Sequence, residues 1–142
     1  MDADGLFVYG TLREGGSNHA WLLRTHPEGL TGAWVAGRLF HLTAGYPALV
    51  PCPEPAAPAP GPGWVRGDFV GYGDETDLES ALADLDPLEG VEEGLFTRER
   101  LPVTLEGGQR FLAWVYLFQV ERLPRLEREA VEIPNGDWAA YL

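Results

Sequence analysis

Apolar residues recur along the chain in short runs that suit β-strands, and glycine or proline separates most of them. We predict strands over residues 6–9, 31–42, 45–50, 64–72, 97–105 and 109–118, the third of these as a turn followed by a short strand. Gly37 interrupts the second run and is typical of a bulge. The pair Gly107-Gly108 predicts a hairpin between the last two runs. The final run is apolar on both faces, which predicts that other elements cover both its sides.

A first helix is predicted over residues 19–26. Ser17 or Asn18 can cap its beginning, because their side chains accept hydrogen bonds from free backbone N–H groups. Pro27 stops it, since the residue before a proline is pushed out of helical geometry. The apolar residues inside this segment give the helix one face to bury.

A second helix is predicted to begin at the capping box formed by Thr76 and Glu79. Its apolar residues fall at helical spacing and form a core-facing stripe: Leu78, Ala81, Leu82 and Leu85. Pro87 predicts an end at Leu85 or Asp86. Two helices with six or seven strands predict an α+β fold with a strongly curved sheet, formed by residues 1–142 as a single domain.

Residues 51–63 hold six prolines and interrupt this pattern. So many prolines allow neither a helix nor a central strand, so an extended, exposed loop is predicted. The parts of the chain on either side are too short to be typical domains, which argues against a linker between domains.

Charge and composition narrow the class of function. The formal net charge is -12 and the pI is near 4.5, which disfavours binding to nucleic-acid phosphates. The acidic first residues do not suit a signal peptide, and no apolar run reaches the length of a membrane span, so a cytoplasmic protein without membrane attachment is predicted. Nothing in the sequence sets the oligomeric state.

Few residues suit metal, cofactor or covalent chemistry. The chain has no metal-ligand cluster, nucleophile elbow, Walker loop or dinucleotide fingerprint, so we predict no metal and no cofactor. Cys52 lies among prolines with no histidine beside it in the sequence. His19 and His26 are interpreted as structural or solvated, and His41 as a hydrogen-bonded structural histidine.

The first apolar run leads into the strongest candidate site. Residues 6–9 run directly into Gly10 and Thr11. Glycine lets the chain bend sharply and lets a ligand approach the backbone, and successive free N–H groups at such a turn suit an anion. A core strand followed by an ordinary surface turn explains the same residues, so the residue pattern leaves both interpretations open.

Four short motifs, in order along the chain, resemble the gamma-glutamylcyclotransferase family of AIG2-like proteins. The motifs are residues 8–12 (Val-Tyr-Gly-Thr-Leu), residues 45–49 (Gly-Tyr-Pro-Ala-Leu), Leu85-Asp86 with Glu89-Gly90, and Gly136-Asp137-Trp138. One such motif is a weak signal, whereas four in order over nearly the whole chain are a strong one. The resemblance implies a small mixed β-barrel with flanking helices and a metal-independent enzyme that acts on a small gamma-glutamyl substrate.

The resemblance also implies a reaction and a set of site residues. In this reaction the α-amine of the substrate attacks its own γ-carbonyl and releases 5-oxoproline. Glu89 occupies the family's catalytic glutamate position and would act as general acid and base. The turn that would bind the glutamyl head consists of Tyr9, Gly10, Thr11 and Leu12, and Arg13 directly follows it.

Two features leave alternatives open. Arginine suits the substrate's α-carboxylate, but a solvated surface arginine explains Arg13 equally well. Phe96 stands where some family members have a tyrosine, so a hydroxyl is absent there, and Tyr116 or Tyr46 is a candidate to replace it. The alternative function is a non-catalytic protein that binds or senses gamma-glutamyl compounds on the same fold.

Overall fold

The structure is a computed structural model that describes residues 4–13, 15–42, 47–88, 96–118, 128, 130–133 and 136–138. Its strands are β1 (Gly5–Val8), β2 (Gly29–His41), β3 (Pro47–Pro51), β4 (Trp64–Gly71), β5 (Phe96–Leu105), β6 (Arg110–Phe118) and β7 (Val131–Glu132). Its helices are α1 (His19–Leu23) and α2 (Glu75–Leu88).

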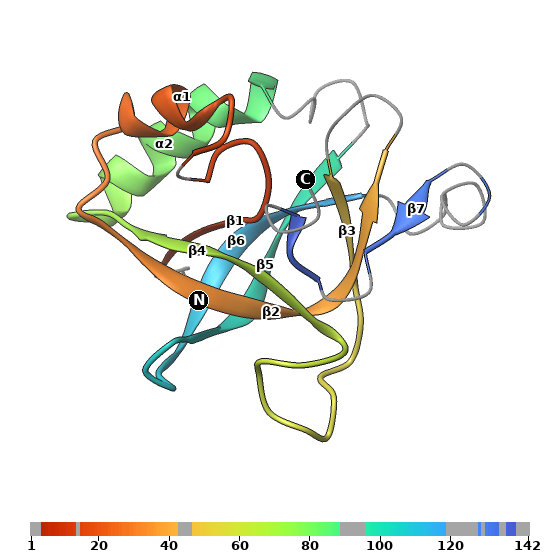
Figure 1. The fold of residues 1–142 in the computed structure, drawn as a ribbon. Coiled ribbons are helices and arrows are strands. Elements are labelled where there is room, and N and C mark those ends of the chain that lie inside the picture. The colour runs from red at the N-terminus through yellow and green to blue at the C-terminus, as the bar shows by residue number, and fades with distance from the viewer. Residues whose placement is uncertain are drawn as a thin grey trace.

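Five strands close into a barrel in the order β2-β4-β1-β6-β5. Two residue pairs between β5 and β2, Ala33 with Leu105 and Trp34 with Thr104, complete the ring. The pairing of β1 with β6 is parallel and the other pairings are antiparallel, while β3 and β7 extend the sheet from the far end of β2. The fold is thus α+β with a small mixed barrel, which confirms the prediction (Figure 1).

The barrel strands bury both of their faces. On β1, Phe7 belongs to the cluster inside the barrel, whereas Leu6 and Val8 belong to an outer cluster shared with both helices. On β6, Val115 faces the interior and Tyr116 faces the outer cluster, so the prediction that this strand is covered on both sides is confirmed. Figure 1 shows α1 and α2 together on one side of the barrel, where they cover this outer cluster.

Helix α1 is shorter than predicted, because it ends at Leu23 rather than His26. The chain leaves the helix early: Thr25 Oγ1 donates to the carbonyl of Leu22 at 2.6 Å, and His26 takes a left-handed conformation with φ 58°. Asn18 is the N-cap residue, but its side chain makes no capping bond and is used elsewhere.

Helix α2 differs from the prediction at both ends. It begins at Glu75, and Asp74 Oδ1 accepts the N–H of Asp77 at 2.8 Å, so Asp74 and not Thr76 caps it. It continues through Pro87 to Leu88. Pro87 cannot donate a hydrogen bond to the carbonyl of Ala83, four residues earlier, and Ala83 is an exposed residue of the last turns of the helix.

Strand β2 changes partners at Gly37 instead of forming a bulge. Its residues up to Ala36 pair with β4, and those from Gly37 onward pair with β3. A Cβ on Gly37 would lie 2.8 Å from the carbonyl oxygen of Val50, so glycine is needed where the two backbones come close. Pro51 closes β3, and residues 52–63 form the predicted loop, most of it exposed.

Candidate active site

Backbone groups build the turn that follows β1. The N–H of Arg13 donates to the carbonyl of Gly10 at 3.1 Å, which closes a β-turn. Asn18 holds the turn from the start of α1: its N–H donates to the Thr11 carbonyl at 2.9 Å and its side-chain amide donates to Thr11 Oγ1 at 3.0 Å. Within the described part of the chain, no hydrogen bond uses the backbone N–H of Gly10, Thr11 or Leu12. These three donors are therefore unused within the described residues.

Gly10 is required by a close approach and not by an unusual dihedral angle. A Cβ there would lie 2.6 Å from Cγ of Pro47, the first residue of β3. The turn therefore packs directly against the beginning of β3, and any side chain at position 10 would push the two apart.

The side chain of Tyr9 is buried, with 7% of its surface exposed. Its hydroxyl donates to the carbonyl of Tyr116 on β6 at 2.6 Å and accepts the N–H of Leu49 on β3 at 3.3 Å. Tyr9 thus joins the ends of three strands beneath the turn. Leu12 is also buried and packs in the outer cluster. Because both side chains are buried, only the backbone groups of Tyr9 and Leu12 are candidates for contact with a ligand. Their role in binding stays a prediction.

Arg13 is not a solvated loop residue, because only 15% of its side chain is exposed. Its guanidinium pairs with Asp68 on β4 at 3.4 Å and with Asp137 near the end of the chain at 3.3 Å. One cation between two carboxylates leaves a net negative charge, which disfavours a third carboxylate from a substrate. The geometry favours a role in holding the turn, and binding of the α-carboxylate by Arg13 stays a prediction.

The motif Gly136-Asp137-Trp138 brings the end of the chain to this turn. Gly136 has a φ of +66°, a Cβ there would lie 2.2 Å from a β4 carbonyl oxygen, and its own carbonyl accepts the N–H of Arg66 at 2.7 Å. The carboxylate of the next residue, Asp137, pairs with Arg13. Trp138 is buried and its Nε1–H donates to His41 Nδ1 at 3.1 Å, which confirms a structural role for this histidine.

The end of α2 is fixed to the barrel wall by Asp86. Arg98 on β5 donates to both of its carboxylate oxygens, at 2.9 and 3.1 Å, and the Tyr116 hydroxyl donates to Oδ1 at 2.7 Å. The Arg98 guanidinium also lies 4.5 Å from the ring centroid of Trp114. The sequence had marked Asp86 only through its motif, and its unfavourable position near a helix C-terminus was the available signal for such a partner.

Several predicted residues lie outside the described residues. Glu89 is one of them, and it follows directly after Leu88, the last residue of α2. Tyr46, a candidate to supply the missing hydroxyl, also lies outside, as do the acidic neighbours Glu92 and Glu93. Nothing in the structure therefore tests the assignment of the catalytic glutamate.

Phe96, which replaces a tyrosine of some family members, is buried in the outer cluster. Its ring meets Phe118 edge-on, with 5.8 Å between the centroids. Tyr116 lies on the same side of the barrel, but its hydroxyl is bonded to Asp86. Tyr116, one of the two candidates to replace the missing hydroxyl, thus already has a partner in the protein.

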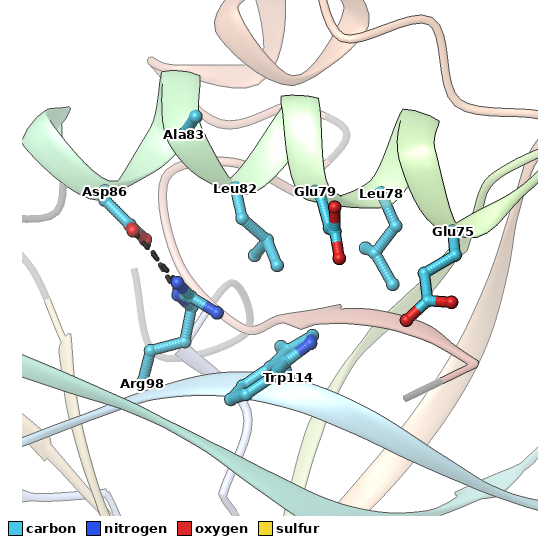
Figure 2. Close-up of a pocket in the computed structure, with 8 residues that line it drawn as sticks. All are labelled: Glu75, Leu78, Glu79, Leu82, Ala83, Asp86, Arg98 and Trp114. Carbon is cyan, nitrogen blue, oxygen red and sulfur yellow. Dashed lines mark hydrogen bonds and ion pairs between the residues drawn. The ribbon is translucent and has the colours of Figure 1, made fainter. Parts of the chain in front are cut away.

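A pocket of about 400 Å³ lies between α2 and the outer wall of the barrel (Figure 2). Figure 2 shows Glu75 and Glu79 extending from the helix toward Trp114, and the ion pair of Asp86 with Arg98 at the far end. It is lined by Glu75, Leu78, Glu79, Leu82, Ala83, Asp86, Arg98 and Trp114. Its lining holds three carboxylates and one guanidinium, so the pocket is acidic.

The described residues contain neither a candidate metal site nor a candidate membrane span. No group of three or more histidine, cysteine, aspartate or glutamate residues among them could hold a metal ion. Among these residues, neither α1 nor α2 is long and apolar enough to cross a membrane.

Known proteins resemble this chain over most of its length. A family model described as "Gamma-glutamyl cyclotransferase, AIG2-like" matches residues 6–140. The gamma-L-glutamyl-butirosin B gamma-glutamyl cyclotransferase of Niallia circulans is 29% identical over an alignment of 141 residues that covers 96% of this chain and 76% of that protein.

Solved structures agree on the fold. YkqA from Bacillus subtilis superposes with a TM-score of 0.61 at 24% identity over 99% of this chain, although this chain spans only 41% of YkqA. The AIG2-like protein of Mus musculus has a TM-score of 0.56 at 24% identity, over 87% of this chain and 84% of that one. The family match and the Niallia circulans relative also support gamma-glutamyl cyclotransferase activity. The chain belongs to the gamma-glutamyl cyclotransferase, AIG2-like family.

Proposed function

We propose that this protein is a gamma-glutamyl cyclotransferase that releases 5-oxoproline from a small gamma-glutamyl compound. The observation that carries the proposal is the turn after β1, where the N–H groups of Gly10, Thr11 and Leu12 have no hydrogen-bond partner among the described residues. Such donors suit the oxyanion that develops on the γ-carbonyl, or a carboxylate of the glutamyl head.

The reaction needs no second substrate. The α-amine nitrogen attacks the γ-carbonyl carbon, the bond from that carbon to the leaving nitrogen breaks, and a five-membered lactam forms. The attacking amine loses one proton and the leaving amine gains one, so atoms and charge balance. Because nucleophile and electrophile belong to one molecule, holding a folded conformer supplies much of the rate.

Glu89 is our proposed acid–base group. It follows directly after α2, the helix whose end Asp86 ties to the barrel wall. As a carboxylate it would take the proton from the α-amine, and as a carboxylic acid it would return that proton to the leaving nitrogen. Arg13, which Asp68 and Asp137 hold, would keep the turn in place rather than touch the reacting atoms.

The acidic pocket suggests the class of leaving group. It begins beside Asp86, three residues before Glu89 in the chain, and continues along α2 to Glu75. Glu75 and Glu79 suit a cation through charge attraction, while the indole of Trp114 already has the guanidinium of Arg98 4.5 Å from its ring centroid. We infer a preference for gamma-glutamyl derivatives of amines that carry a further positive charge. On a panel of matched gamma-glutamyl amines, kcat/KM should be higher for the cationic members, and Glu79→Gln should reduce that difference.

The test of the proposal is single-turnover formation of 5-oxoproline by wild type and Glu89→Gln. Glutamine keeps the shape of the side chain but cannot carry a proton between nitrogens. General acid–base catalysis typically contributes ~10²–10⁴-fold, so the rate should fall by that order while the fold is retained. Glu92→Gln and Glu93→Gln are the matched controls and should remain near wild type. A wild-type rate in Glu89→Gln with loss in either control would show that another carboxylate is the base.

The non-catalytic alternative makes a different forecast. A binding protein would take up gamma-glutamyl compounds in calorimetry and return them unchanged. Wild type that binds members of the panel without releasing 5-oxoproline would establish that alternative and overturn the proposed activity.

A further inference from the structure

Tyr116 lies between the two parts of the proposed site. Its carbonyl accepts the hydroxyl of Tyr9, the residue directly before the turn, at 2.6 Å. Its own hydroxyl donates to Asp86 in the last turn of α2 at 2.7 Å. Tyr116 is only 3% exposed and its bond with Tyr9 is buried, whereas its bond with Asp86 is partly buried, because 21% of the Asp86 side chain is exposed. Burial makes such bonds stronger and more costly to lose.

Asp86 occupies a position that the helix alone would disfavour. A negative charge near a helix C-terminus opposes the helix dipole, and α2 has no basic residue in its last turn. Arg98 supplies the missing cation from β5, with two hydrogen bonds to the carboxylate and its guanidinium over Trp114. Asp86 is therefore stabilised only while the end of α2 lies against the barrel wall.

We propose that Tyr116 and Asp86 are positioning residues, which fix the end of α2 and so set where Glu89 stands relative to the turn at residues 10–13. This inference rests on the proposed role of Glu89. The physical requirement is distance, since a base must come within hydrogen-bond reach of the amine that it deprotonates. A displacement of ~1 Å in such a group costs about 10²-fold in rate.

The first test measures kcat and KM for 5-oxoproline release by Tyr116→Phe, Asp86→Asn and the double variant. Each single variant should lower kcat by about 10- to 100-fold. KM should stay within about threefold, because the turn that binds the glutamyl head keeps its own contacts. The double variant should be no more than about threefold below the weaker single variant, since the two residues act as one unit.

Tyr72→Phe is the matched control. The Tyr72 hydroxyl also makes one side-chain hydrogen bond, to Thr25 Oγ1 at 2.6 Å, and Tyr72 packs against the same outer cluster. This variant loses a hydrogen bond of similar length near the beginning of α2 and not at its end, so kcat should remain within about threefold of wild type. An equal loss of kcat in Tyr72→Phe would reduce the effect to general destabilisation and overturn the inference, as would a wild-type kcat in Tyr116→Phe.

A second measurement does not depend on turnover. Hydrogen exchange of the amides in the last turn of α2 should become about fivefold faster in Tyr116→Phe and Asp86→Asn, the factor expected from losing one typical hydrogen bond. It should not change in Tyr72→Phe. Unchanged exchange at the end of α2 in the first two variants overturns the inference, whatever their activity. If wild type releases no 5-oxoproline, the proposed function fails separately, and exchange still decides whether Tyr116 and Asp86 fix the helix end.

Discussion

Replacement of Arg13 by methionine separates a structural clamp from a substrate ligand. Methionine keeps most of the apolar stem but removes the guanidinium. Asp68 and Asp137 then lose their shared cation, with only 15% and 31% of their side chains exposed. The clamp interpretation predicts a less stable protein in which the turn is held more loosely.

The size of the effect follows from burial. Breaking a fully buried ion pair costs ~3–5 kcal/mol, whereas an exposed pair contributes ~0–1 kcal/mol. The pairs of Arg13 lie between these limits and have long N···O distances of 3.3 and 3.4 Å, so we expect a loss of about 1–3 kcal/mol. At ~3 °C per kcal/mol for a domain of this size, the melting temperature should fall by roughly 3–9 °C.

Thermal melts followed by far-UV circular dichroism test the stability, and steady-state kinetics test the site. Arg13→Met should raise KM only severalfold, and the double variant with Asp137→Asn should show a coupling energy of about 1 kcal/mol. Arg110→Met is the control, because its ion pair with Glu54 is about half exposed and should contribute under ~0.5 kcal/mol. An unchanged melting temperature in Arg13→Met together with a KM raised more than ~100-fold would refute the clamp and restore Arg13 as a ligand of the α-carboxylate.

Three further predictions follow from other parts of the structure. Gly136→Ala should lower the free energy of unfolding in urea by about 2–5 kcal/mol, because its φ is +66° and a β4 carbonyl oxygen would lie 2.2 Å from the new Cβ. Gly29→Ala is the control and should be near neutral, because the space around Gly29 is open. The hydrogen bond from Arg38 lowers the pKa of Glu132 below its ordinary value of 4.5, so the pair stabilises above that pH and loses its effect as pH falls through the lowered pKa. Glu132→Gln should therefore cost under ~1 kcal/mol at pH 7 and progressively less on acidification, and a cost that grows toward low pH contradicts this sign. Replacement of residues 53–62 by a short Gly/Ser linker should lower the melting temperature by less than ~3 °C, because most of this loop is exposed, and a large drop would show that it packs on the barrel.

The sequence by itself determined the features that depend on local periodicity. The continuous apolar runs at residues 6–9 and 109–118 predicted strands where β1 and β6 lie, and the glycine pair after β5 predicted the hairpin. The apolar character of β6 on both faces predicted cover on both sides, because a strand exposes its side chains to two faces in turn. The order of four motifs led to the family and through it to the closed barrel.

Helix ends were determined less well, because local signals of similar strength compete and tertiary packing decides between them. Asp74 and Thr76 are both good N-cap residues, and two caps so close in the sequence differ by less than the packing of the helix against the barrel contributes. The end predicted at Leu85 or Asp86 was also wrong, because the last turn of α2 tolerates Pro87.

Only the tertiary structure decided what surrounds the site residues. Arg13 meets partners 55 and 124 residues away in the chain, and such contacts leave no periodic trace in a sequence. Tyr9 had been predicted from its motif, but barrel closure assigns its hydroxyl to β6 and β3. In an isolated helix Asp86 would be mildly destabilising, because it lies near the C-terminus. In the folded protein it attaches α2 to the barrel, because β5 and β6 bring Arg98 and Tyr116 beside it. In each case the register of distant strands sets the partner, because side chains separated by many residues meet only after the barrel has closed.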